Sequence, residues 1–416
     1  MRPRLLLLIP TSTYRTEDFV AAVRKVGVDM VVASERPSTL EEAFPDNLLT
    51  LDFADPGQAA RAVAELARRK PIDAVVPVDD LTTVVGAAIA SALGLPGANS
   101  VAAVATTRNK SRMREAVARA GVPSPPYRLF TLADDPAAAA RQVPYPCVLK
   151  PTVLAASRGV IRADDEAEFV AAFRRIAAIL ETLDVAGQGD GAREILVEGF
   201  VPGREVALEG LLVGGALRVL ALFDKPDPLD GPFFEETIYV TPSRLPRETQ
   251  AAIAGCAARA TAALGLREGP IHAELRVNDR GPWLIEVAAR SIGGLCSRTL
   301  RFGTGLTLEE IIVRHALGAD LASLERERQP AGVMMIPIPR AGVLEAVRGQ
   351  EDAKSVPGIE EVTITAHLGQ ALVPLPEGSR YLGFVFARAD TPERVEAALR
   401  EAHQRLAFVI APAARG

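Results

Sequence analysis

The segment HAELRVNDRGPWLIEVAAR, which begins at His272, carries the strongest chemical pattern in the sequence. Two strand-like runs flank a turn at residues 278–282, which predicts a β-hairpin. Folding the runs symmetrically about Arg280 places Glu274 opposite Glu286. Facing carboxylates repel each other, and burial on a sheet face strengthens the repulsion. The pattern therefore predicts a divalent cation between them, and magnesium prefers a partial protein shell that substrate phosphates complete.

A cation, Arg290, follows Glu286 by four residues and could neutralise phosphate oxygens or a developing oxyanion. The alternative is that both glutamates lie solvated on an exposed sheet face and that Arg290 pairs with one of them. His272 alternates onto the same face as Glu274, and both a pocket-lining role and a structural role are open for it. Cys296 fits a small buried filler better than a nucleophile.

A second segment, ILVEGFVPGREVALEG from Ile195, combines an apolar strand with a carboxylate, a Pro-Gly turn and a further carboxylate. Glu198 and the backbone next to it could lie beside an adenine, and Glu205 could accept hydrogen bonds from ribose hydroxyls. The alternative is a hairpin with exposed glutamates.

Two lysines could act as point charges on phosphates. Lys150 ends the strand-like run CVLKP, and Lys110 lies in the helical segment RNKSRMR, where a solvated helix face is the alternative. The loop TVLAASRGV after Lys150 could cover phosphates with its backbone amides, although Gly159 is its one glycine.

The elements that must position these groups fall into different classes along the chain. Up to about residue 97, near-continuous apolar strands alternate with amphipathic helices, which predicts a small doubly wound α/β domain with a parallel sheet. Its first loop, TSTYR, lacks G-x-G-x-x-G, so a dinucleotide site there is not supported. Asp79 and Asp80 follow a strand's carboxyl end, where they are either ligand contacts or, with Asp80, a helix N-cap.

From residue 104 onward the pattern indicates an α+β arrangement. A helix is expected over residues 104–120, followed by strand-rich stretches up to about residue 288 and by alternating strands and helices from about residue 332. The loop of residues 224–242 offers charges and two phenylalanines, which suits a substrate cover and equally suits an irregular surface loop.

Composition narrows the function classes. The chain has 416 residues, enough for two or three domains, and its formal net charge of −5 argues against nucleic-acid or anionic-membrane binding. Three cysteines and four histidines, none at zinc-ligand spacing, argue against a disulfide scaffold and a structural zinc site. The apolar run of residues 5–9 is short for a signal peptide, and no stretch reaches the length of a membrane span. We expect a soluble, cytoplasmic protein.

Taken in order, the lysines, the loop at residues 157–160, the two glutamate pairs and Arg290 resemble the ATP-grasp superfamily over essentially the whole chain. The resemblance implies an ATP-grasp fold with four parts: an N-terminal doubly wound pre-ATP-grasp domain (1–103), a lid subdomain with a linker helix (104–195), a catalytic subdomain (196–330) and a C-terminal subdomain (331–416). It also implies roles for individual residues. Phosphate contacts would come from Lys110 and Lys150, the lid from Ser157 and Gly159, adenine contacts from Glu198, Phe200 and Val201, ribose contacts from Glu205, and metal ligands from Glu274 and Glu286.

Within the superfamily, the E-V-x-x-R stretch, residues 291–294 and the C-terminal RYLGFVFARADTPERVEAAL are similar to L-amino acid ligases and other carboxylate–amine ligases. This implies that ATP, with magnesium or manganese, activates a small carboxylate as an acyl phosphate that an amine then attacks, while Arg290, Gly293 and Gly294 stabilise the oxyanion. Two alternatives are a biotin-carboxylase-like or purine-pathway ligase and a non-catalytic ATP-binding regulatory module. One departure is Ala288, where many relatives have Asn. A homodimer is the default expectation for such an enzyme.

Overall fold

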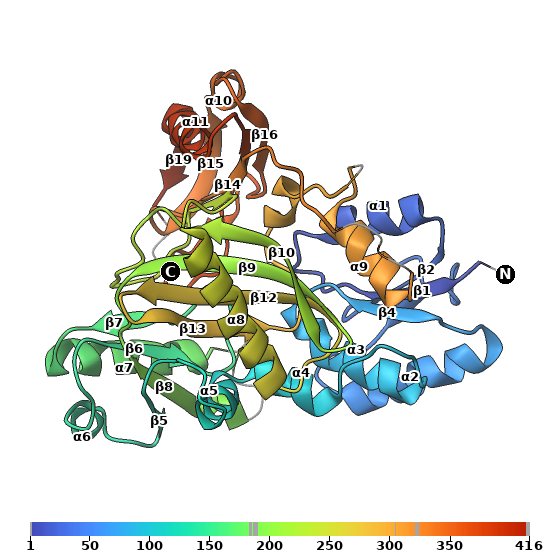
Figure 1. The fold of residues 1–416 in the computed structure, drawn as a ribbon, viewed down its shortest axis with the longest axis horizontal. Helices are drawn as coiled ribbons and strands as arrows, with labels where there is room; N and C mark the ends of the chain where they lie inside the picture. The colour runs from blue at the N-terminus through green and yellow to red at the C-terminus, as the bar shows by residue number, and fades with distance from the viewer. Residues whose placement is uncertain are drawn as a thin grey trace.

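The computed structural model describes residues 2–182, 185, 190–303, 305–319, 321 and 324–412. Figure 1 shows the N-terminal part (blue) beside a large curved sheet (yellow-green), with a smaller green lobe below that sheet and the last segments (red) above it. The expected combination of α/β and α+β parts is confirmed.

The N-terminal part is a parallel sheet with the strand order β3-β2-β1-β4 among the described residues. Its strands are apolar because helices cover both faces, and β1 is buried along its whole length. The elements are β1 (Arg4–Leu8), α1 (Thr16–Val26), β2 (Asp29–Ser34), β3 (Leu48–Thr50), α2 (Pro56–Arg69), β4 (Ala74–Pro77) and α3 (Asp80–Ala92).

The helix expected over residues 104–120 is wrong as a single element, because the structure has α4 (Val101–Arg108) and α5 (Lys110–Arg119). Asn109 between them has an extended backbone, and its side chain accepts hydrogen bonds from the amides of Ser111 and Arg112. A residue that caps the second helix in this way ends the first. The break sets Lys110 at the first turn of α5.

The small lobe contains an antiparallel sheet with the order β5-β8-β6-β7 in the described part of the chain. The buried face of α7 packs on it through phenylalanines and isoleucines. Its elements are β5 (Tyr127–Thr131), α6 (Pro136–Ala140), β6 (Cys147–Pro151), β7 (Ile161–Ala163), α7 (Glu166–Leu180), the 3-10 turn η1 (Asp190–Arg193) and β8 (Glu194–Gly199).

The large sheet has the order β13-β12-β9-β10-β11-β14-β18-β16 over the residues described. Its elements are β9 (Arg204–Val213), β10 (Ala216–Asp224), β11 (Ile238–Thr241), α8 (Arg247–Ala263), β12 (Gly269–Asn278), β13 (Gly281–Ala288), η2 (Cys296–Thr299), α9 (Leu308–Ala316), β14 (Ala331–Ile336), β16 (Ile359–Ile364) and β18 (Gly383–Arg388).

The C-terminal segment supplies β14, β16 and β18 to that sheet, and it also forms a small antiparallel sheet with the order β17-β15-β19. Its remaining elements are β15 (Gly342–Arg348), α10 (Gln350–Lys354), β17 (Ala371–Leu372), α11 (Pro392–Arg405) and β19 (Ala407–Ala411). The division into four parts stays a prediction. Its boundary between residues 195 and 196 falls inside β8.

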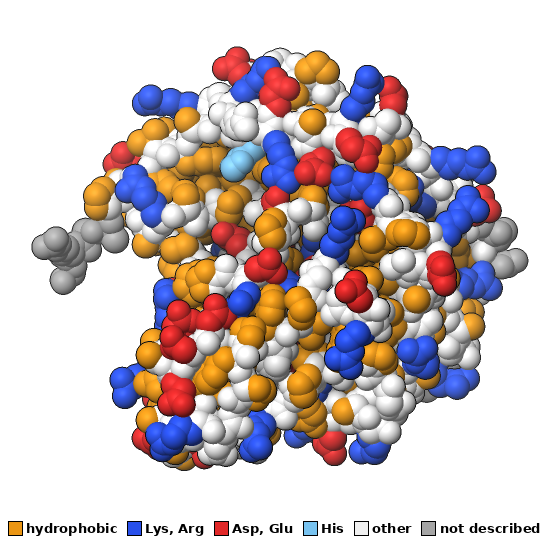
Figure 2. Space-filling view, turned by 60° about the vertical axis from the view of Figure 1, so that its left-hand side comes forward, with side chains coloured by type: hydrophobic (Ala, Val, Ile, Leu, Met, Phe, Trp, Pro, Cys, Tyr) orange, Lys and Arg blue, Asp and Glu red, His pale blue; other side chains and the backbone are white. Residues whose placement is uncertain are grey.

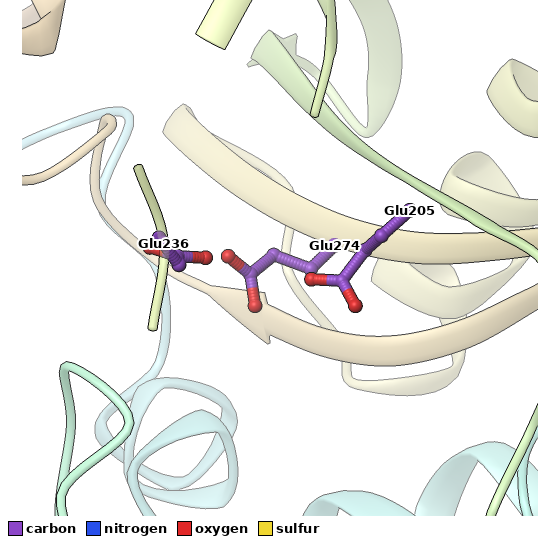
Figure 3. Close-up of side chains that lie close together, drawn as sticks. All are labelled: Glu205, Glu236 and Glu274. Atoms are coloured by element: carbon purple, nitrogen blue, oxygen red, sulfur yellow. The ribbon is translucent and has the colours of Figure 1, made fainter. Parts of the chain in front are cut away.

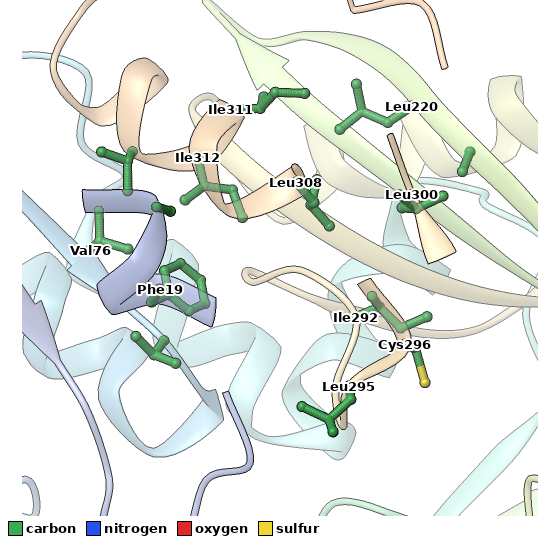
Figure 4. Packing of buried hydrophobic residues seen from close by; sticks show 14 of the residues in the cluster. Phe19, Val76, Leu220, Ile292, Leu295, Cys296, Leu300, Leu308, Ile311 and Ile312 are labelled. Atoms are coloured by element: carbon green, nitrogen blue, oxygen red, sulfur yellow. The ribbon is translucent and has the colours of Figure 1, made fainter. Parts of the chain in front are cut away.

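One hydrophobic core joins the N-terminal part to the large sheet (Figure 4). Phe19 of α1 and Val76 of β4 lie in the same cluster as Ile311 of α9 and Leu220 of β10. The two parts are therefore packed through buried side chains, and groups on either side can contribute to one site. None of the helices in the described part of the chain combines the length and the apolar character that a bilayer crossing requires.

Candidate active site

A cavity of about 660 Å³ lies where the N-terminal part, the small lobe, the large sheet and the C-terminal segment meet. Among the predicted site residues, it is lined by Lys110, Lys150, Ser157, Glu198, Phe200, Val201, Glu205, Glu274, Glu286, Arg290, Gly293 and Gly294. Gly159 is outside the described lining. Figure 2 shows a face with charges of both signs that is hollowed at its left-hand side.

The predicted hairpin brings Glu274 opposite Glu286, and this pairing is confirmed. The expected symmetric turn about Arg280 is wrong, because Asn278 pairs with Gly281 and leaves a two-residue turn. A bulge between Glu274 and Leu275 shifts the register and restores the pairing of the glutamates.

Neither glutamate lies on an exposed sheet face, so that alternative is wrong. The Glu274 side chain is 18% exposed and that of Glu286 is 31% exposed. Lys110 Nζ lies 3.1 Å from Glu286 Oε1 and donates to the carbonyl oxygen of Leu154. Lys110 is buried, so a solvated helix face is also wrong for it.

Glu198 of β8 forms a buried ion-pair network that joins the small lobe to α5. Its carboxylate lies 2.6 Å from Arg114 Nη2 and 2.8 Å from Lys150 Nζ. Burial alone would raise the pKa of Glu198, but the two cations lower it below its ordinary value. The alternative of exposed hairpin glutamates is wrong here, because Glu198 is 2% exposed. The side chain thus fixes Lys150 at the cavity wall.

Three carboxylates converge on one lysine that sequence analysis did not single out. Glu205 of β9, Glu274 of β12 and Glu236, which precedes β11, point toward one another (Figure 3). Lys225 Nζ lies 2.8 Å from Glu205 and 2.9 Å from Glu274, and it also contacts Glu236. Burial raises the pKa of Glu236, and the charge of Glu274 raises it further, although Lys225 acts in the opposite direction.

The cluster bears on the loop of residues 224–242, for which a substrate cover and an irregular surface loop were the alternatives. Lys225 is 7% exposed, and Phe234 and Glu236 line the cavity, so the loop contributes to the site. The sequence signal that could have found Lys225 is its position directly after an apolar strand, the same signal that identified Lys150.

His272 joins this cluster from a position two residues before Glu274 on β12, on the same face of the strand. Its Nδ1 contacts Glu209, and its Nε2 lies 3.4 Å from Glu274 Oε1. Burial by itself would lower the pKa of His272, but the two carboxylates raise it to about 9. This shift favours the charged imidazole at neutral pH, and His272 lines the cavity, which is one of the two roles left open for it.

Arg290 pairs with neither glutamate of the hairpin, so that alternative is wrong. Its Nε and Nη2 lie 2.9 and 2.7 Å from Asp80 Oδ2. Asp79 is the residue that caps α3, because its side chain accepts from the amide of Asp80 in a capping box with Thr82. Asp80 is therefore free of the capping role that one alternative gave it, and both aspartates line the cavity.

The loop after β6 reaches the cavity with a left-handed backbone. Ala156 and Ser157 have φ values of 53° and 55°, in a region that non-glycine residues adopt rarely. Gly159 has a structural reason to lack a side chain, since a Cβ there would lie 2.7 Å from Pro151 Cγ. The lid roles of Ser157 and Gly159 stay predictions.

The segment after β13 also lines the cavity, through Arg290 and residues 292–294. Gly294 adopts a φ of 59° and lies so close to the Phe384 ring that a Cβ would approach it to 2.9 Å. Ala288 also lines the cavity and offers no ligand atom, as the sequence indicated. Cys296 is 1% exposed in the shared core, and burial raises the pKa of its thiol, which confirms the filler expectation.

Comparisons with known proteins decide the family. Residues 19–97 match the model of the ATP-grasp N-terminal domain, residues 143–299 that of the ATP-grasp domain, and residues 334–411 that of the L-amino acid ligase C-terminal domain 2. The crystal structure of an L-amino acid ligase from Bacillus licheniformis is 27% identical with a TM-score of 0.79, and the match covers 99% of both chains. The chain belongs to the ATP-grasp superfamily.

The curated relatives that match this ATP-grasp chain include a ligase and a synthase. Alanine–anticapsin ligase of Bacillus subtilis (strain 168) is 27% identical over 326 residues, which cover 74% of this chain and 68% of the relative. Carnosine synthase 1 of Gallus gallus is 29% identical over 350 residues, or 79% of this chain and 37% of the relative. The chain is a carboxylate–amine ligase. A biotin carboxylase domain from Hydrogenobacter thermophilus, 17% identical with a TM-score of 0.68, shares the fold.

Proposed function

We propose that this ATP-grasp ligase joins two amino acids: ATP phosphorylates the carboxylate of one, and the amine of the second attacks the acyl phosphate. The observation that carries the proposal is that the two lysines, the glutamates and Arg290 all line one cavity. Its volume of about 660 Å³ lies within the range of small-molecule sites. The similarity to amino-acid-joining enzymes over most of the chain supports the substrate class.

We assign the nucleotide to the space between the small lobe and the large sheet. Lys110 and Lys150 would contact its phosphates, Ser157 would cover them, and Glu198, Phe200 and Val201 would line the adenine end. Glu205 would accept from the ribose hydroxyls. Protein contacts hold the side chains of Lys110, Lys150, Glu198 and Glu205, so the charged groups of the site are organised before the nucleotide arrives.

Magnesium fits the carboxylates of Glu274 and Glu286, because both offer the oxygen donors that a hard divalent cation prefers. One oxygen of each is engaged by a cation, Lys225 or Lys110. When bound there, the ion would neutralise phosphate oxygens. Glu205, Glu236 and Glu274 also lie close enough together to hold a metal, but Lys225 contacts all three.

The chain's own groups would then act on the acyl end. Arg290 and the amides near Gly293 and Gly294 would stabilise the oxyanion that forms when the amine attacks. The residues that enclose the cavity would exclude water, which otherwise hydrolyses the acyl phosphate. The presence of both hairpin glutamates and Arg290 in one site supports turnover over a non-catalytic binding role.

The physiological setting we propose follows from the chain's chemistry. All three cysteines are unpaired and buried, which favours a reducing compartment such as the cytoplasm. The partners would be small carboxylates and amines, and a homodimer is the default assembly.

A pairwise screen tests the proposed function. Amino acids and small carboxylates, including bicarbonate, are offered in pairs with ATP and magnesium, and inorganic phosphate is measured. We expect phosphate release that requires both members of an amino-acid pair. Release with bicarbonate and none with amino-acid pairs would favour the carboxylase-type alternative.

A further inference from the structure

Residues 374–381, between β17 and β18, form a segment that closes one side of the cavity; we call it the strap. Ser379, Arg380 and Tyr381 of the strap line the cavity. The family resemblance gave no role to any of them.

The strap is held by contacts to two other parts of the molecule. On the small lobe, the amide of Gly159 donates a hydrogen bond to the carbonyl oxygen of Pro376 at 2.9 Å. Arg175, also of the small lobe, forms a bidentate ion pair with Glu377, with N–O distances of 2.5 and 3.0 Å. On the N-terminal part, the amide of Tyr381 donates to the hydroxyl of Tyr14 at 3.4 Å. These contacts fix the backbone on both sides of Arg380.

Arg380 differs from the other cations that line the cavity. Lys110, Lys150, Arg108, Arg276 and Arg290 each face a carboxylate, and Arg158 donates to Thr182. Arg380 is exposed, and among the described residues it has no hydrogen bond or ion pair. An arginine that lines a cavity and has no protein partner is available to a planar anion, which it binds through two hydrogen bonds.

The surroundings of Arg380 place it at the acyl end of the cavity. The positive charge of Arg380 acts to lower the pKa of Tyr14. The Tyr14 ring packs edge-on against the Phe384 ring, with 5.4 Å between the ring centroids. The Phe384 ring in turn lies against Gly294. The strap meets the small lobe, which carries most groups assigned to the nucleotide, at Pro376 and Glu377, whereas Tyr381, directly after Arg380, meets Tyr14 of the N-terminal part. A ligand of Arg380 is therefore more naturally a reacting substrate than the nucleotide.

We propose that Arg380 binds the α-carboxylate of the amino acid that donates the amine, so that the second substrate is an α-amino acid rather than a simple amine. This rests on the proposed function. The carboxylate of the first substrate is consumed, because it becomes an acyl phosphate and then an amide as phosphate leaves, whereas the α-carboxylate of the second substrate is unchanged from binding to product. A permanent cation suits the group that stays an anion throughout.

Paired acceptors and three variants test the assignment. With the carboxylate donor found in the screen, the amine-donating amino acid is compared with its carboxamide in wild type, Arg380→Gln, Arg380→Lys and the control Arg218→Gln. Arg218 is an exposed arginine of β10 outside the described cavity lining. Each variant is also assayed for the KM of ATP and for its unfolding temperature.

We expect Arg380→Gln to raise the KM for the amino-acid acceptor roughly 10- to 100-fold, the usual effect of losing a charge-assisted pair. The carboxamide acceptor and the KM of ATP should change less than about threefold, and Arg380→Lys should recover part of the loss. An equal loss with acid and carboxamide, or a loss confined to the KM of the carboxylate donor, would overturn the assignment.

A binding measurement separates this inference from the proposed function. If wild type releases no phosphate with any amino-acid pair, the proposed function fails by that result. Arg380 is then judged by the rise in unfolding temperature that amino acids and their carboxamides cause. Amino acids should stabilise wild type more than Arg380→Gln, and carboxamides should stabilise both alike. Equal stabilisation of both proteins by amino acids would overturn the inference.

Discussion

Asp80, in the first turn of α3, and Arg290, which follows β13, form a buried ion pair between segments 210 positions apart in the chain. Arg108 lies 3.4 Å from the second oxygen of Asp80. Burial would raise the pKa of Asp80, but these guanidinium groups hold it well below its ordinary value. The N-terminal part therefore orients the arginine that we assign to the oxyanion.

Replacing Asp80 by Asn should lower both turnover and stability. Arg290 would lose its anionic partner while it stays buried, which costs about 2 kcal/mol of unfolding free energy. Because the folded pKa of Asp80 is depressed, its contribution is present above the unfolded pKa of about 3.9 and is lost as the pH falls through the folded value. The measurements are phosphate release at pH 7 and denaturant unfolding at pH 7 and at pH 5, and the loss of unfolding free energy should be the same at both because both lie above the unfolded pKa.

The control for Asp80 is Asp46→Asn, which removes an exposed pair with Lys70. Exposed pairs contribute little, so its unfolding midpoint should match wild type. An Asp80→Asn protein that keeps wild-type turnover would show that Arg290 needs no orientation by the N-terminal part.

Glu286→Gln should abolish phosphate release and leave the fold intact. The amide keeps the size of the side chain but removes the negative charge of one carboxylate ligand from the proposed magnesium site. Phosphate release is measured over a magnesium titration, with circular dichroism as the check on folding. The matched control is Glu345→Gln on β15, an exposed position. Unaltered turnover of Glu286→Gln would remove this glutamate from the metal assignment.

Lys225→Met should destabilise the protein at neutral pH and destabilise it less in mild acid. Without the ammonium, Glu205, Glu236 and Glu274 repel one another, and protonation relieves that repulsion. Protons then bind the folded variant more readily than the unfolded chain, so its stability rises as the pH falls. Unfolding is followed from pH 5 to pH 8. A constant difference from wild type over that range would contradict the role assigned to Lys225.

His272→Gln should cost more stability at pH 6 than at pH 9.5. The folded pKa of His272 is about 9, above the unfolded value of about 6.5. Its contribution is therefore complete below pH 6.5 and is lost as the pH rises through 9, with an upper bound of about 3 kcal/mol. Denaturant unfolding of the nucleotide-free protein measures the difference. Parallel stability curves for variant and wild type would show that the imidazole is neutral.

The sequence was most informative where one side chain obeys one local rule. Two strand-like runs around a turn predicted the hairpin, and the pairing of Glu274 with Glu286 agrees with that expectation. The pairing, however, depends on a bulge that no turn rule indicated. Asn109 is a similar case, because its capping of α5 outweighed a helical pattern that continued on both sides.

The partners of the charged groups could not be predicted, because they come from distant segments. Lys225 gathers three glutamates from separate elements, and Arg290 reaches Asp80 in another part of the fold. The repulsion between facing carboxylates indicated that positive charge must lie near Glu274 and Glu286. Which cation each one meets depends on the packing of distant segments, since Lys225 follows β10 and Lys110 begins α5.

The continuity of the large sheet limits how the chain can be shortened. Strands β14, β18 and β16 follow β11 in that sheet, and β14 covers β11 along its whole length. A protein cut near residue 330 would leave the buried strand β11 with unpaired backbone groups at a sheet edge. Such edges recruit strands from other molecules, so the shortened protein should aggregate rather than yield a free-standing nucleotide-binding unit.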